Sequence, residues 1–75
     1  MPPVRVVIAD DHPVVRSGIR DLLDAADGLT VVGEATNGTE ALDRVAEEHP
    51  DVLLLDVEMP ELSGVEVARK LQAQS

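Results

Sequence analysis

The chain has 75 residues, and its 15 acidic side chains against 6 basic ones give a formal net charge of -9. A chain this negative repels the phosphate backbone, so we expect no direct nucleic-acid contact by this segment. It contains no Cys, which excludes disulfides and thiolate metal sites, and no apolar run long enough for a membrane span or a signal peptide, so we expect a cytoplasmic protein.

The first third of the chain predicts a buried strand and then an amphipathic helix. Residues 4–9 read Val-Arg-Val-Val-Ile-Ala, a β-branched run typical of a parallel strand that is covered on both faces. Pro13 suits the first turn of a helix, and apolar residues recur at helical spacing over 13–26. Gly28 then favours a helix end, because it can adopt the left-handed conformation.

The middle third predicts a second strand and a second helix. Residues 29–35 form a weaker strand, which we expect to be less buried and to lie at a sheet edge. Asn37 resembles a helix N-cap, and Glu40 stands where the acid of a capping box belongs. Apolar residues at helical spacing then predict a helix over 38–48.

The last third repeats the pattern. Residues 51–55 are a short apolar run behind a proline, which favours a strand over 51–55 with Asp56 at its carboxyl end. A second capping box, from Ser63 to Glu66, predicts a helix over 64–73. Three alternating strand-helix units predict an α/β fold with right-handed crossovers and a parallel sheet covered on both faces.

Acidic residues stand at the carboxyl ends of the first and third predicted strands, Asp10 and Asp11 at one and Asp56 at the other. The reactive crevice of an open parallel sheet lies just outside these ends, so adjacent strands would bring the three carboxylates together. Like charges this close favour a raised carboxyl pKa or a hard cation, and Mg²⁺ fits best. A carboxylate beside such a cation is a competent nucleophile toward phosphorus.

Each of these polar residues also has a purely structural interpretation. Asp10 and Asp11 are suited to a turn or an N-cap, and Asp56 to a solvated strand end. His12 is a candidate ligand or base, but because it stands beside Pro13 at a helix start we expect it to cap the helix or lie exposed. His49 is expected to act as a cation at a helix end.

Two stretches together resemble the receiver domains of two-component response regulators, and the match spans nearly all of the chain. They are Val6-Val7-Ile8-Ala9-Asp10-Asp11-His12-Pro13 and Leu54-Leu55-Asp56-Val57-Glu58-Met59-Pro60, with Gly64 beyond. The Asp-Asp-His-Pro start and the Val-Gly-Glu-Ala-Thr-Asn-Gly stretch are most similar to the branch whose members end in a helix-turn-helix DNA-binding domain. The resemblance implies the (βα)3 portion of a doubly wound, flavodoxin-like sheet over 1–75, with strand order 2-1-3 and the fourth and fifth units missing.

Carried over residue by residue, the resemblance implies that Asp56 is the phosphoacceptor. It implies Asp11 and Asp56 as Mg²⁺ ligands, Asp10 as a ligand through water, and Glu58 as a ligand through its backbone carbonyl. The phosphoryl donor would be a sensor histidine kinase, and the full-length protein would regulate transcription through its output domain. Such a chain is a signalling module and not an enzyme with a separate substrate.

The family also places a Thr or Ser and a Lys at the ends of its last two strands, and this chain stops before both. Lys70 does not replace that lysine, because it lies in the third predicted helix on the side away from the crevice. A sheet that stops here would expose the third strand as an apolar edge, so we expect a homo-oligomer formed through this strand and adjacent helices. The competing hypothesis is a truncated, non-catalytic fragment that acts only as an oligomerising or assembly unit.

Two enzyme or ligand-binding alternatives fit the sequence poorly. Phosphatases of the haloacid dehalogenase type use Asp-x-Asp, whereas Glu58 stands at the third position here. Nucleotide-binding folds carry glycine-rich phosphate loops, and neither of the two common patterns is present in the sequence.

Overall fold

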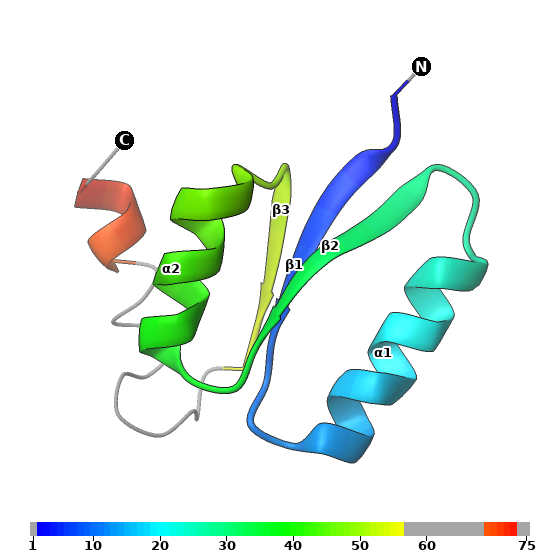
Figure 1. Cartoon of the computed structure of the whole chain (residues 1–75), viewed down its shortest axis with the longest axis horizontal. Coiled ribbons are helices and arrows are strands. Elements are labelled where there is room, and N and C mark those ends of the chain that lie inside the picture. Colours follow the sequence, from blue (N-terminus) through cyan, green and yellow to red (C-terminus); the bar gives the residue numbers. More distant parts are fainter. Residues whose placement is uncertain (1, 57–68, 74–75) are drawn as a thin grey trace.

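The computed structural model describes residues 2–56 and 69–73. One parallel sheet lies between two helices on opposite faces (Figure 1). The elements in chain order are β1 (Val4–Ala9), α1 (Pro13–Ala25), β2 (Leu29–Ala35), α2 (Gly38–Glu48) and β3 (Val52–Leu55). Residues 69–73 are helical, whereas the predicted start of that helix lies outside the described residues. Among the residues described, no helix has the length and apolar character that crossing a bilayer requires.

The strand order β2-β1-β3, with both pairings parallel, confirms the predicted 2-1-3 arrangement. β1 is the central strand, and its last four residues, Val6 to Ala9, are almost completely buried. β2 is mostly half-buried, as expected for an edge strand. The bounds differ from the predicted ones by single residues: α1 ends at Ala25, and β3 begins at Val52.

The face covered by α2 holds a closely packed cluster of the buried core. Ala9, Ala35 and Ala41 are at most 1% exposed. Partly buried leucines pack around this cluster, namely Leu42, Leu53, Leu55 and Leu71. The small alanine side chains let α2 approach the sheet closely, and the leucines at the margin complete the apolar layer.

The N-terminus of α2 is capped as the sequence predicts. The Asn37 Oδ1 accepts a hydrogen bond of 2.8 Å from the Glu40 backbone N–H. The Glu40 carboxylate accepts from the backbone N–H and the hydroxyl of Thr36, at 2.7 and 2.6 Å. In a standard capping box it would accept from the N-cap residue itself, so the box here reaches one residue further back.

The face of the sheet on which α1 lies is only partly covered. The helical spacing predicts an amphipathic α1, and in the structure α1 buries no residue, with Val15 and Leu22 49% and 74% exposed. α1 lies against β1 and β2. A cavity of about 480 Å³ remains between the helix residues Val15 and Ile19 and Leu54 of β3. α1 is an amphipathic helix, but none of the described residues covers the part of its apolar surface that faces β3.

Backbone hydrogen bonds fix the pairing of β1 with β3 at both ends. At the start of β3, the Arg5 N–H donates to the Asp51 carboxylate at 2.9 Å, and the Asp51 N–H donates to the Arg5 carbonyl at 2.8 Å. At the other end, the Asp56 N–H donates to the Ala9 carbonyl at 2.9 Å. The residues that follow the two strands therefore emerge side by side.

Candidate functional site

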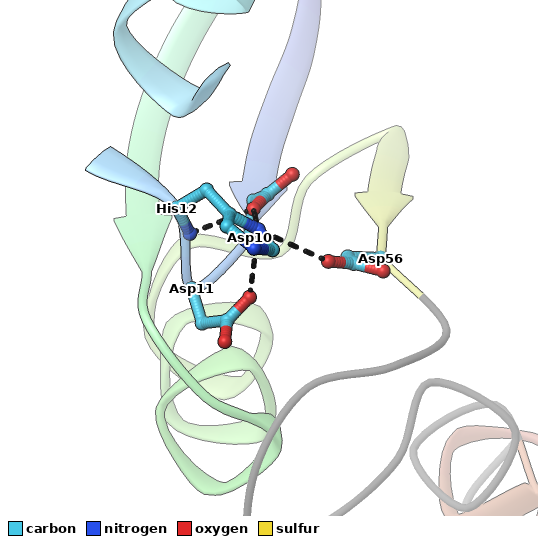
Figure 2. A group of neighbouring side chains, drawn as sticks. All are labelled: Asp10, Asp11, His12 and Asp56. Carbon is cyan, nitrogen blue, oxygen red and sulfur yellow. Dashed lines mark hydrogen bonds and ion pairs between the residues drawn. The ribbon is translucent and has the colours of Figure 1, made fainter. Parts of the chain in front are cut away.

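The carboxyl ends of β1 and β3 bring three aspartates together with one histidine (Figure 2). Ligand atoms of Asp10, Asp11, His12 and Asp56 all lie within 4.8 Å of one another. This geometry agrees with the convergence expected from the strand ends. Glu58 lies outside the described residues.

Asp10 is the buried member of the cluster, with 8% of its surface exposed. Its Oδ1 accepts a 2.8 Å hydrogen bond from the His12 backbone N–H and lies 3.0 Å from the His12 Nδ1. The backbone hydrogen bond is the main reason why the pKa of Asp10 is lowered from its ordinary value, and burial opposes the shift. Asp10 is therefore a carboxylate, not a carboxylic acid, at neutral pH.

The side chain of His12 lies between the carboxylates, a position that suits the ligand alternative and not the capping role expected from the sequence. Its Nδ1 is 3.0 Å from Asp10 Oδ1, 3.0 Å from Asp11 Oδ1 and 3.7 Å from Asp56 Oδ2. The hydrogen bond to Asp10, followed by the charge of Asp11, raises the pKa of His12. His12 is the N-cap residue of α1 and is exposed, as expected, but its side chain makes no cap hydrogen bond. A histidine directly after two aspartates at a strand end was the available signal.

Asp11 and Asp56 complete the cluster, and both reach solvent. Their side chains are 30% and 23% exposed. The Asp11 Oδ1 is itself buried and accepts no hydrogen bond within the described part of the chain, although the His12 ring is near. A buried carboxylate oxygen that lies 3.0 Å from the His12 Nδ1 but accepts no hydrogen bond within the described residues, set among further carboxylate oxygens, fits a bound cation. The residues present could thus hold a metal ion.

Arg16 ties this strand end to α1 and β2. Its Nη1 donates to the Asp10 backbone carbonyl at 2.9 Å, and its Nε donates to Glu34 Oε1 at 3.1 Å. Arg20 also donates to the Glu34 carboxylate. The two arginines and Glu34 therefore hold the β1–α1 junction in place, a positioning role that the sequence patterns gave no reason to expect.

Comparison with known proteins gives a consistent result. The model of the response regulator receiver domain family matches residues 6–75. The chain is 50% identical over 68 residues to the response regulator GacA of Pseudomonas viridiflava, covering 91% of this chain and 32% of that protein.

Two solved structures show the same fold. The signal receiver domain of the putative response regulator NarL from Mycobacterium tuberculosis superimposes with a TM-score of 0.96 at 40% identity, covering 99% of this chain and 60% of that one. The RcsB response regulator of Salmonella typhimurium, described in terms of DNA interaction, gives a TM-score of 0.88 at 32% identity, covering 97% of this chain and 38% of that one. The chain thus spans about a third of the length of the curated relative.

Proposed function

Because the chain belongs to the response regulator receiver domain family, we propose that it accepts a phosphoryl group on Asp56. The observation that carries the proposal is the convergence of Asp56 with Asp10 and Asp11 at adjoining strand ends. An isolated carboxylate at a strand end would have no means of holding a cation next to its own oxygen. Three carboxylates in one crevice have that means.

The side chains divide the work by position. An Asp56 oxygen attacks the phosphorus, a P–O bond forms, and the bond from phosphorus to its leaving group breaks. Asp11 and Asp56 would hold Mg²⁺ directly, and Asp10 would hold it through water, with the Glu58 carbonyl as a further ligand outside the described residues. Bound Mg²⁺ would supply positive charge that offsets the charge of the transferring group. Arg16 keeps Asp10 in position through its backbone carbonyl.

The partners follow from the same proposal. The physiological donor is the phosphohistidine of a sensor histidine kinase in the cytoplasm, whose leaving imidazole takes up a proton as the P–N bond breaks. The output in the whole protein is transcription control through a separate DNA-binding domain. The description of the RcsB relative in terms of DNA interaction supports this assignment. The charge of -9 argues against DNA contact by this segment itself.

The test is to incubate the chain with acetyl phosphate or beryllofluoride and Mg²⁺, and to locate the adduct by peptide mass spectrometry and NMR. We expect an adduct on Asp56 that is lost in Asp56→Asn and on chelation of the metal. Asp43→Asn is the matched control, because it removes one exposed carboxylate from α2 and should leave the adduct intact. No adduct on Asp56 would overturn the proposal for this chain and leave the assembly unit as its function.

A second proposal, compatible with the first, is that copies of the chain associate through β3. In the described part of the sheet β3 pairs with β1 on one side, and Val52 and Leu54 are 41% and 38% exposed. A strand edge with apolar side chains invites pairing with another chain. Light scattering should give a mass above that of the monomer at micromolar concentration, and Val52→Lys should lower it. A monomer mass for the unmodified chain contradicts this proposal.

A further inference from the structure

The imidazole of His12 does not cap the helix at whose start it stands. His12 is the N-cap residue of α1, but the side chain makes no cap hydrogen bond. Its Nδ1 instead lies 3.0 Å from one oxygen of each neighbouring aspartate and 3.7 Å from Asp56 Oδ2 (Figure 2). One nitrogen donor is therefore placed among three oxygen donors.

The spacing of these four donors matches one coordination sphere. Metal–ligand bonds of about 2.1 Å place adjacent octahedral ligands about 3 Å apart and opposite ones about 4 Å apart. The separations of Nδ1 from the three carboxylate oxygens are 3.0, 3.0 and 3.7 Å, and all four atoms lie within 4.8 Å. The widest of these separations exceeds the spacing of opposite octahedral ligands by roughly half an ångström, so the side chains must move by about that much to enclose an ion.

A second observation points to a cation at the same place. The Asp11 Oδ1 is buried and lies in an ion pair 3.0 Å from the His12 Nδ1, but it accepts no hydrogen bond from the residues that the structure describes. A buried acceptor of this kind is satisfied when a cation binds it. Because the His12 ring is 64% exposed, it can adjust its orientation as the ion enters.

The mixture of oxygen and nitrogen donors determines which divalent ions this site binds more tightly. Carboxylate oxygens suit Mg²⁺ and Mn²⁺, whereas imidazole nitrogen suits Zn²⁺, Co²⁺ and Ni²⁺. Three carboxylates alone give these ions little advantage beyond their general order of affinity. A nitrogen ligand adds an interaction that Mg²⁺ uses poorly, so it shifts the preference of the site toward the transition ions.

We propose that His12 is a nitrogen ligand, through Nδ1, that lets this acidic site bind a borderline divalent transition ion such as Ni²⁺ or Zn²⁺ as well as Mg²⁺. The inference rests on the proposed function, because it uses the same three carboxylates. Coordination uses the lone pair of Nδ1, so the ring carries its hydrogen on Nε2 and any second proton is released to solvent. His12 then determines the metal specificity of the site.

The experiment measures the affinities of the 75-residue chain for Ni²⁺, Zn²⁺ and Mg²⁺ by titration calorimetry, with His12→Ala as the variant. We expect Ni²⁺ and Zn²⁺ affinity to fall by about tenfold or more, since loss of even an outer-shell partner costs that much, and Mg²⁺ affinity to change less. His49→Asn is the matched control, because it removes the other histidine of the chain, which is exposed at the end of α2. Asn also tolerates the left-handed conformation found there.

A second measurement uses the unmodified chain, so it does not depend on whether a variant folds. The ¹⁵N resonance of the His12 Nδ1 should shift on addition of Zn²⁺ and stay nearly unchanged with Mg²⁺. Equal Ni²⁺ affinities of the wild type and His12→Ala, or a loss caused by His49→Asn instead, would overturn the inference. If Mg²⁺ binding is then still lost in Asp11→Asn, the proposed function stands, and if the wild type binds no divalent ion at all, both fail.

Discussion

The two faces of the sheet differ in how deeply the helix on each face is buried. α2 buries Gly38 and Ala41 against a close-packed apolar layer, whereas α1 buries no residue and borders a cavity of about 480 Å³. Both helices are amphipathic in sequence. The difference shows that an apolar stripe specifies which side of a helix faces the sheet, while the number of neighbouring elements determines how much of that stripe is buried.

The strongest test of this comparison uses adjacent residues of β3. Leu53 packs against the cluster under α2, and Leu54 lines the cavity beside α1. Leu53→Ala should lower the free energy of unfolding by about 2 kcal/mol, the low end of the range for a leucine that is not fully buried. Leu54→Ala should cost less than about 1 kcal/mol, because the side chain is already 38% exposed. Urea denaturation followed by circular dichroism measures both, and equal costs would contradict the contrast between the faces.

The next test removes the cap of α2. Asn37→Ala should lower the free energy of unfolding by about 1 kcal/mol, since the Glu40 N–H loses its acceptor. Asn37→Ser keeps an acceptor oxygen at the N-cap and should retain most of the stability. The comparison is by urea midpoint, and a Ser variant as unstable as the Ala variant would show that the cap is not the cause.

A smaller effect is expected from pH. Hydrogen bonds from the Thr36 hydroxyl and backbone N–H lower the pKa of Glu40. A folded-state pKa below the unfolded one contributes stability that is present at neutral pH and is lost as the pH falls through the folded-state value. Glu40→Gln should therefore flatten the decline in urea midpoint between neutral and acidic pH. A steeper decline in the urea midpoint of the Gln variant would contradict a lowered pKa of Glu40 in the folded state.

The smallest effect belongs to the open face. Leu22 of α1 is 74% exposed, so Leu22→Gln should change the free energy of unfolding by no more than about 0.5 kcal/mol. Its measurement is the same urea titration. A loss comparable to that of Leu53→Ala would mean that Leu22 is buried in solution, and the assignment of α1 to an open face would be wrong.

Those features that follow from local patterns were predictable. The β-branched run at residues 4–9 indicated the buried central strand, and Asn37 with Glu40 indicated the start of α2. The meeting of Asp10 with Asp56 followed from both residues standing at carboxyl ends of parallel strands. The roles assigned to these aspartates stay proposals.

Three other features depend on tertiary structure, and the sequence alone could not decide them. The exposure of Leu22 depends on what lies beside α1 in space, which helical spacing does not encode. The place of the His12 ring depends on a competition between capping the helix and contacting carboxylates from another strand. Arg16 likewise binds Asp10 and Glu34, which lie outside its own helix, so the spacing of residues along the chain does not predict these contacts.

The hydrogen bonds between Arg5 and Asp51 join β1 to the residue that precedes β3. They help to fix the register of β3 against β1, and this register determines where Asp56 lies at the opposite end of the strand. A slip of one residue would displace the Asp56 side chain by about 3.3 Å and turn it to the other face. A disturbance at Arg5 could therefore impair the acidic crevice from its far end, without altering any group within it.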